Sequence, residues 1–151
     1  MRVVYNGISF DSQLECNNYR LLEKSKVDFE YNSERCKFQY HRPLQKGVCH
    51  SCGEEHVSSL HNYTCDFVFK TLNSGKYIHV ETKGNGHCFK PETRTKHILL
   101  QKQYPDIDLR FVFSNWNTKI SRGAKTSNRD WAERYNFPCA NKYIPTDWFN
   151  E

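Results

Sequence analysis

The feature that most constrains this 151-residue chain is a pair of strand-like segments on either side of a turn sequence. Residues 63–70 (YTCDFVFK) and 76–83 (KYIHVETK) are rich in aromatic and β-branched side chains, and the segment between them contains LNSG. This pattern predicts a β-hairpin. If the central Asn and Ser form a two-residue turn, Asp66 lies directly opposite Glu81 on the neighbouring strand.

The rest of the chain alternates between helical and extended patterns. Asp11 or Ser12 can cap a first helix, Pro91 suits the first turn of a second, and Ser127 can cap a third. We therefore expect helices at 11–25, 92–104 and 127–135, strands at 36–41 and 108–113, and loops at 44–62 and 114–126. Together with the hairpin, this order is typical of one mixed α/β domain that spans residues 1–151.

Composition narrows the class of protein. Hydrophobic residues make up only 37% of the chain, below the usual ~45–50%, so the core has to rely on the 15% aromatic residues. No window approaches the ~18 apolar residues of a membrane span, and no apolar stretch follows Met1, so we expect neither a membrane protein nor an exported one. Seven cysteines without an export signal favour a reducing compartment.

The positive charge is concentrated in one block. The chain has a net charge of +5, and residues 83–129 alone carry ten basic and three acidic side chains, a net +7. Such a block suits a polyanion such as DNA, because neutralised phosphates release their counterions. The alternative is an ordinary solvated basic surface.

The hairpin also carries a group of residues with catalytic potential. Asp66, Glu81 and Lys83 have the spacing D–x14–E–x–K, and Lys83 shares a strand face with Glu81. Two neighbouring carboxylates can share Mg²⁺ or Mn²⁺, which polarises a phosphate and lowers the pKa of a bound water. A lysine beside them can orient that water or offset developing charge. The set favours phosphodiester hydrolysis, although Glu and Lys also alternate on many solvated strands.

A cluster of cysteine and histidine residues lies in the loop before the hairpin. Residues 49–61 are CHSCGEEHVSSLH, in which Cys49 and Cys52 form a CxxC pair followed by a glycine. Two such thiolates can bind one Zn²⁺, and His56 and His61 can complete a tetrahedral structural site. Competing candidates for the last two ligands are Cys36, His41, His50 and Cys65. An unreactive thiol pair and a disulfide stay open as alternatives.

The order strand, Asp, hairpin, Glu-x-Lys, helix and strand resembles the core of the PD-(D/E)xK nuclease superfamily, which has the restriction-endonuclease-like fold. In detail, the chain resembles the phage endonuclease I family of Holliday-junction resolvases. The matching stretches follow one another over nearly the whole chain: FDSQLE (10–15), VDFEY (27–31), NYTCDFVF (62–69), HVETKG (79–84), RTKHILLQKQYPDIDLRFVFS (94–114), NTKISRG (117–123) and WAERYNFPCANKYIPTDW (131–148).

The resemblance implies a mixed sheet flanked by helices, in a domain-swapped homodimer. Residues 44–61 depart from the family as an insertion, and the cysteine and histidine spacing described above predicts that this insertion is a small zinc-binding loop. It assigns Glu15 as an active-site carboxylate, Asp66 and Glu81 as direct metal ligands, and Lys83 as the lysine of the motif. In the family, the helix carboxylate comes from one subunit and the other three residues from its partner. The exchange runs through an extended bridge, which corresponds to residues 36–46 here.

The resemblance also points to the residues that face DNA. The basic helix around Arg94, Lys96 and His97 would lie against phosphates, although His97 sits beside apolar residues and is alternatively a packed core histidine. The Asn117–Lys119 loop would do the same. With the remaining cations of the basic block, the candidate DNA-binding residues are Arg94, Lys96, Lys102, Asn117, Lys119, Arg122 and Lys125. The chain departs from the family at Cys65, where Pro is usual, and we expect activity to survive this change.

These observations lead us to expect a Mg²⁺- or Mn²⁺-dependent endonuclease that resolves four-way DNA junctions as a homodimer, with no membrane partner. The resemblance places it in the cytoplasm of an infected bacterium. Two alternatives stay open. One is another nuclease of the same superfamily, of the mismatch-nicking or restriction type. The other is a non-catalytic, zinc-stabilised protein that binds nucleic acid.

Overall fold

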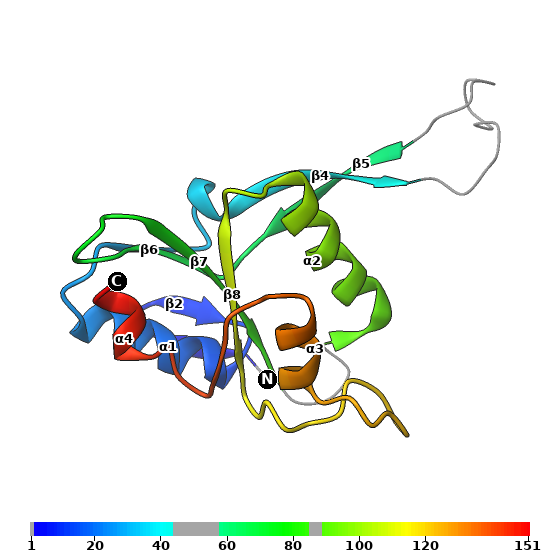
Figure 1. Cartoon of the computed structure of the whole chain (residues 1–151). Helices are drawn as coiled ribbons and strands as arrows, with labels where there is room; N and C mark the ends of the chain where they lie inside the picture. The colour runs from blue at the N-terminus through cyan, green and yellow to red at the C-terminus, as the bar shows by residue number, and fades with distance from the viewer. Residues whose placement is uncertain (1, 44–57, 85–88) are drawn as a thin grey trace.

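The computed structural model describes residues 2–43, 58–84 and 89–151, and its centre is a five-stranded mixed sheet (Figure 1). Its strands lie in the order β3 (Phe29–Tyr31), β6 (Phe67–Lys70), β7 (Tyr77–Lys83), β8 (Asp108–Phe113) and β9 (Cys139–Asn141). β3, β6 and β7 pair antiparallel, whereas β8 runs parallel to both β7 and β9. The prediction of a mixed α/β fold with a sheet flanked by helices is therefore confirmed.

Helices pack on both faces of this sheet (Figure 1). Because side chains alternate along a strand, Phe111 and Phe113 face one layer while Val112 faces the other. Five phenylalanines are among the largest fully buried side chains, so aromatic residues do carry the core. The flanking helices are α1 (Gln13–Lys24) and α4 (Thr146–Phe149) on one face, and α2 (Pro91–Gln103) and α3 (Asn128–Arg134) on the other.

The predicted hairpin is present, and its register is confirmed. Phe67 pairs with Val80 and Phe69 with Ile78, the alignment that puts position 66 opposite position 81. The turn itself is longer than predicted, since Thr71 N–H donates to the Lys76 carbonyl at 2.9 Å and encloses the four residues LNSG. The register is the same because the four-residue loop has the same centre as the two-residue turn.

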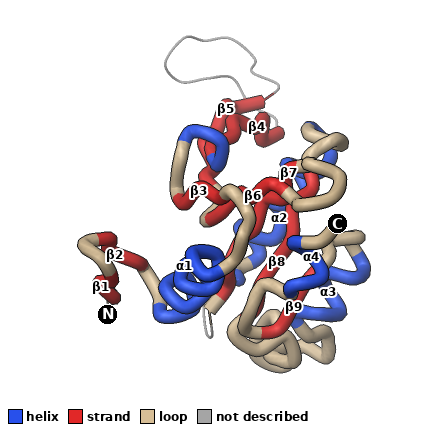
Figure 2. Tube along the Cα trace, turned by 90° about the vertical axis from the view of Figure 1, so that its left-hand side faces the viewer, coloured by secondary structure: helices blue, strands red, loops and turns tan. Residues whose placement is uncertain are grey.

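The segment before the hairpin differs from the prediction. Residues 58–62, expected as loop, belong to β5 (Ser58–Thr64), which pairs antiparallel with β4 (Lys37–Pro43). The expected strand at 63–70 is thus two strands, because the chain leaves one sheet and enters another at Cys65 and Asp66. The β4–β5 ribbon, called the arm below, extends from the sheet across α2 (Figures 1 and 2). Because the arm is mostly polar and has few buried residues, the sequence pattern does not predict β5 as a strand.

The end of α2 fixes the arm in place. The Gln103 side chain donates from Nε2 to the His41 carbonyl and accepts from His41 N–H, both at 2.7 Å. In the same region the Tyr104 hydroxyl donates to the Gln39 carbonyl. The glutamine amide thus satisfies the backbone of an edge strand as a neighbouring strand would.

Short elements at the edges complete the fold. β1 (Val3–Tyr5) and β2 (Ile8–Phe10) form a hairpin beside α1 (Figure 2), with Asn6 and Gly7 at φ +48° and +75° in its turn. A 3₁₀ turn (Glu34–Cys36) leads into the arm. The sequence patterns did not predict these pieces or the three-residue strands β3 and β9, which are too short to show a period. No helix within the described ranges has the length and apolar character needed to cross a bilayer.

A charge network lies at the end of the sheet where β8 begins. The Arg110 guanidinium is buried and donates to both Asp108 and Glu151 at 2.7–2.8 Å. Lys76 adds a second cation 2.7 Å from Glu151. Hydrogen bonds from Arg110 and Lys76 lower the pKa of Glu151 from 4.5 to about 2.

This network predicts a stability effect that depends on pH. Glu151→Gln removes the charge and is expected to reduce the free energy of unfolding by about 1 kcal/mol near neutral pH. A depressed native pKa stabilises the fold above the ordinary value of 4.5 and ceases to do so as the pH falls toward 2. Urea unfolding of wild type and variant from pH 7 to pH 2.5 tests this, with the exposed, helix-paired Glu133→Gln as control. A difference that is constant over this range would contradict the network's role.

Candidate active site

Asp66 lies at the point where the chain passes from the arm into the central sheet. Its N–H donates to the Val80 carbonyl at 3.1 Å, one residue before the regular pairing of β6 begins. Its carboxylate is fixed by the strand opposite, because Oδ2 accepts from Thr82 N–H at 2.7 Å and from the Thr82 hydroxyl at 2.6 Å. The Asp66 side chain therefore has a single orientation, toward β7.

Glu81 is buried on β7, with 5% of its surface exposed, and both of its oxygens are bonded. Oε2 accepts from the Tyr63 hydroxyl at 2.5 Å, and Oε1 accepts from the Lys83 ammonium. The predicted placement of Lys83 on the face of Glu81 thus agrees with the geometry. The third neighbour is His97, whose Nε2 lies 4.0 Å from Glu81 Oε1.

Glu15 has a structural role as well as a place near the site. It helps to order the start of α1, where Ser12 is the N-cap: Glu15 N–H donates to the Ser12 hydroxyl, and the Glu15 carboxylate accepts from that hydroxyl and from Asp11 N–H. Its Oε2 also accepts from the Tyr31 hydroxyl at 3.1 Å. The helix is held to the C-terminal part of the chain by buried Asn18, which bonds to Lys142 and Ile144.

The three carboxylates act on one another electrostatically. Burial, followed by the negative charges of Glu81 and Glu15, raises the pKa of Asp66 well above its ordinary value. Burial also raises the pKa of Glu15. Burial alone would raise the pKa of Glu81, but Lys83 and Tyr63 hold it below its ordinary range. A cation placed beside Asp66 and Glu81 would relieve their mutual repulsion.

This donor set fits a hard divalent cation. Asp66 and Glu81 supply carboxylate oxygens, and Mg²⁺ is commonly held by one or two carboxylates together with waters and substrate phosphates. Within the described ranges, no three His, Cys, Asp or Glu side chains form a group that could hold a metal ion. Two carboxylates leave the other coordination positions of Mg²⁺ to waters and substrate phosphates.

His97 is a packed core residue and does not face solvent, so the alternative of a packed histidine is correct. Its side chain is fully buried, and Nδ1–H donates to the Thr93 carbonyl at 2.7 Å. Burial lowers its pKa to about 4, so the imidazole is neutral at physiological pH. Among the described residues Nε2 has no hydrogen-bond partner, and it lies 4.0 Å from Glu81 Oε1.

Two of the predicted DNA-binding residues are engaged within the protein. Arg94 donates to the carbonyls of Phe89 and Ile120 at 2.8 and 2.9 Å, so it ties α2 to the 114–126 loop. The Lys96 ammonium lies 4.9 Å from the centre of the Tyr63 ring, and burial lowers its pKa. The helical pattern placed both on the polar side of α2 but could not show that this side meets the loop and the arm.

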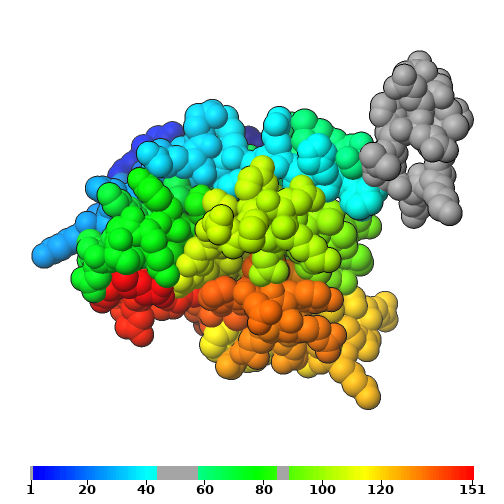
Figure 3. Space-filling view, turned by 45° about the horizontal axis from the view of Figure 1, so that its top comes forward, coloured from blue at the N-terminus to red at the C-terminus, as the bar shows by residue number. Residues whose placement is uncertain are grey.

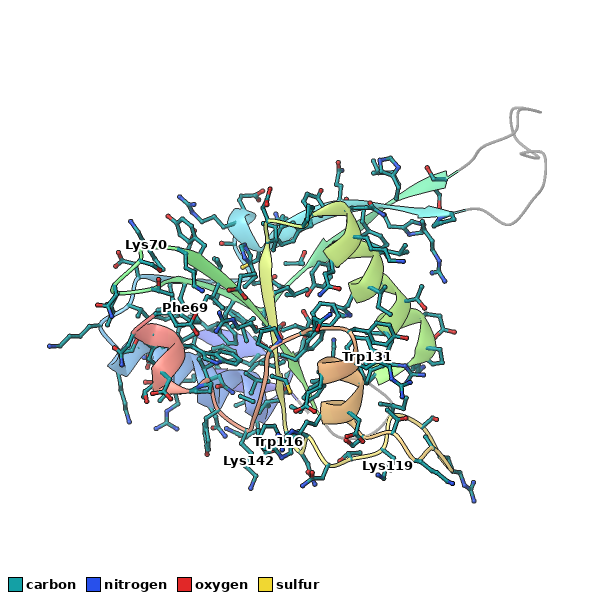
Figure 4. All side chains as sticks on the ribbon, viewed as in Figure 1. Phe69, Lys70, Trp116, Lys119, Trp131 and Lys142 are labelled. Carbon is teal, nitrogen blue, oxygen red and sulfur yellow. The ribbon has the colours of Figure 1, made fainter. Side chains whose placement is uncertain are left out.

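The other candidates lie on the surface. Lys102 is exposed on the last turn of α2, and the remaining four are exposed on the 114–126 loop, which protrudes from the body (Figure 3). Lys119 donates to the Lys125 carbonyl at 2.7 Å, and Figure 4 shows Lys119 away from the sheet. Arg129 stacks on Trp116 at the base of this loop, 4.5 Å from the ring centre. The four loop residues are Asn117, Lys119, Arg122 and Lys125.

The zinc prediction falls mostly outside the described residues. Cys49, Cys52 and His56 lie in 44–57, which the structure does not describe. His61 lies on β5 with its Nε2 2.7 Å from the Ser59 hydroxyl. Of the competing ligands, Cys36 and Cys65 are fully buried where the arm joins the sheet, and Cys65 N–H donates to the Cys36 carbonyl at 2.9 Å.

Three residues of the site escaped the sequence patterns. Tyr63 and Tyr31 donate to Glu81 and Glu15, and Thr82 donates to Asp66. Thr82 stands between the Glu and the Lys of the motif, which was the one available indication. Tyrosines in strands are so often core residues that neither position was distinctive.

The chain is similar to known proteins over nearly its whole length. A sequence model of the phage endonuclease I family matches residues 2–151. The chain is 35% identical over 143 residues to Endonuclease I of Escherichia phage T7, a match that covers 95% of this chain and 80% of the relative. It is 33% identical over 139 residues to Endodeoxyribonuclease 1 of Enterobacteria phage T3, covering 92% and 76%.

The double role of Glu15 predicts that capping and charge can be separated. Glu15→Gln keeps a side-chain oxygen that can accept from Asp11 N–H and removes the repulsion of Asp66, so we expect thermal stability at least equal to wild type. Glu15→Ala loses the side-chain bonds to Asp11, Ser12 and Tyr31 at the start of the helix and is expected to cost about 0.5–1.5 kcal/mol. Thermal unfolding of the two variants measures this difference. Equal destabilisation by both substitutions would contradict the capping assignment.

Proposed function

This chain belongs to the phage endonuclease I family, and we propose that it is a structure-selective DNA endonuclease that resolves four-way (Holliday) junctions by divalent-metal-dependent phosphodiester hydrolysis. The observation that carries the proposal is the convergence of Asp66, Glu81 and Lys83 at one end of the sheet, with Glu15 close to Asp66. Both phage relatives are named as endonucleases, which supports the proposed activity.

Each residue has a distinct task in the proposed reaction. Asp66 and Glu81 would hold Mg²⁺ or Mn²⁺, and when bound such an ion polarises a phosphate and activates water. Lys83, bonded to Glu81, offsets negative charge beside the scissile group. Glu15, held by Tyr31, adds a carboxylate on the side of Asp66 that faces α1.

The exposed cations would bind the backbone of the DNA. Lys102 and the loop residues Lys119, Arg122 and Lys125 present charge to solvent, and Asn117 adds a polar group that can reach a phosphate. Such contacts position DNA without selecting its bases. The described residues offer no base-specific element on this surface, so recognition is expected to follow the branched shape and phosphate geometry.

A cleavage assay tests the function against its nearest rival. Wild-type protein is incubated with a synthetic four-way junction, or with linear and mismatched duplexes of the same sequence, in Mg²⁺ and in EDTA. We expect paired nicks in the junction only with Mg²⁺, and much slower cleavage of the duplexes. Preference for the linear or mismatched duplex would favour a restriction-type or mismatch-nicking enzyme, while junction binding without any Mg²⁺-dependent cleavage would indicate a non-catalytic binding protein.

We also propose a homodimer that exchanges identical elements through the arm. In the single chain Glu15 lies near Asp66, so exchange would re-form between two subunits the contacts that one chain makes with itself. The arm suits this exchange because its strands lie outside the five-stranded sheet. Each active site would then combine Glu15 from one subunit with Asp66, Glu81 and Lys83 from the other.

A mixing experiment distinguishes the two arrangements. Glu15→Gln and Glu81→Gln chains are co-expressed with different affinity tags, and the doubly tagged dimer is isolated. With exchange, one of its two sites receives both wild-type carboxylates, so nicking of one strand is recovered although each homodimer is inactive. If every site is built within one chain, both sites of the mixed dimer carry a defect and no nicking appears.

A structural Zn²⁺ held by Cys49, Cys52, His56 and His61 remains part of the proposal. It rests on the CxxC spacing, and on a loop whose polar sequence offers few apolar residues of its own for packing. Metal analysis of purified protein should find about one zinc per chain, and far less than one would count against the site.

We propose that the enzyme acts in the cytoplasm of the host cell, where thiolates are kept reduced.

A further inference from the structure

We propose that Tyr63, at the base of the arm, is a positioning residue that holds the carboxylate of Glu81 in place for the divalent cation. The inference rests on the proposed function, because it takes Glu81 as a metal ligand. It assigns Tyr63 no contact with the substrate, and it makes the affinity for the cation depend on how the arm is seated.

The first support is the hydrogen bond itself. The Tyr63 hydroxyl donates to Glu81 Oε2 at 2.5 Å, and each of the two residues is only 5% exposed. A buried carboxylate needs donors, and a hydrogen bond to an ionised group is about twice as strong as a neutral one. Lys83 donates to Oε1, so the Tyr63 hydroxyl is the donor that holds Oε2 and fixes the rotation of the carboxylate.

The second support is the packing of the Tyr63 ring, which fixes where its hydroxyl points. Phe38, from the other strand of the arm, stacks on it with ring centres 6.1 Å apart and planes at 25°. His97 of α2 meets it edge-on at 5.2 Å, and the Lys96 ammonium lies over the ring at 4.9 Å. The ring is thus enclosed by the arm and by α2. This packing directs its hydroxyl toward the Glu81 carboxylate.

Tyr63 also connects the arm to the metal ligand by a short covalent path. It lies on β5, and the chain continues from this strand through Cys65 to the second carboxylate, Asp66. The arm is anchored to α2 by the hydrogen bonds of Gln103 and Tyr104. A change in the seating of the arm would therefore reach Glu81 through the Tyr63 hydroxyl.

The test compares two tyrosine-to-phenylalanine variants. Tyr63→Phe removes the hydroxyl and keeps the ring, so Phe38, His97 and Lys96 retain their contacts. Tyr104→Phe is the matched control, because its hydroxyl bonds to the arm backbone at Gln39 rather than to a carboxylate, and the two bonds between Gln103 and His41 still hold the arm on α2. Mn²⁺ binding is measured without DNA by electron paramagnetic resonance of the free ion, and thermal unfolding confirms that both variants fold.

Loss of a partner that orients a metal ligand typically weakens binding about 10–100-fold, so we expect a loss of this size in Tyr63→Phe and wild-type affinity in Tyr104→Phe. In junction cleavage, the Mg²⁺ concentration for half-maximal rate should rise by a similar factor, with most of the maximal rate regained at saturating Mg²⁺. A merely structural role would instead lower the cleavage rate by the same factor at every Mg²⁺ concentration, saturating Mg²⁺ included.

Two results would overturn the inference, and they differ. If Tyr63→Phe binds Mn²⁺ as tightly as Tyr104→Phe, while Glu81→Gln loses binding, Tyr63 does not position the ligand and the proposed function is untouched. If wild type and Glu81→Gln bind Mn²⁺ equally, the assignment of Glu81 as a metal ligand fails, and this inference fails with it.

Discussion

The close placement of two carboxylates, the partly buried Asp66 and the buried Glu81, is the constraint on which the rest of this structure depends. Burial and mutual repulsion disfavour their charged forms, so the protein must supply donors and cations around them. Thr82 donates hydrogen bonds to Asp66, and Glu81 accepts from Tyr63 and Lys83. Because the strands are joined by a hairpin of fixed register, this cluster is assembled largely by local folding.

The position of Asp66 also explains the shape of the molecule. It stands where the chain turns from the arm into the sheet. Cys65 and Asp66 belong to neither strand, so the Asp66 side chain can turn toward Thr82. The arm brings Tyr63 over Glu81, and α1 brings Glu15 toward Asp66 from the opposite layer. The site thus joins the arm, the sheet and a helix cap, and a change in any of the three would alter its charge balance.

Sequence reasoning succeeded where the determinants were local. The hairpin register, the capping of α1 by Ser12 and of α3 by Ser127, and the aromatic core all follow from neighbouring residues. It failed where partners are distant. Nothing in the pattern of α2 indicates that Arg94 braces a loop or that Lys96 lies over Tyr63, and Arg110 is neutralised by Glu151 from the end of the chain. The basic block therefore overstates the charge offered to DNA, and Glu15 came to notice only through the family resemblance.

The central claim is that the Asp66–Glu81 pair performs metal-dependent cleavage of branched DNA. Its most direct test is single-turnover cleavage of a four-way junction by Glu81→Gln, with junction binding measured in parallel in Ca²⁺. We expect Glu81→Gln to cleave more slowly than wild type on the order of 100-fold or more, with junction affinity nearly unchanged, because Glu81 is buried and is not one of the exposed cations expected to bind DNA. Cleavage by Glu81→Gln at the wild-type rate would contradict it.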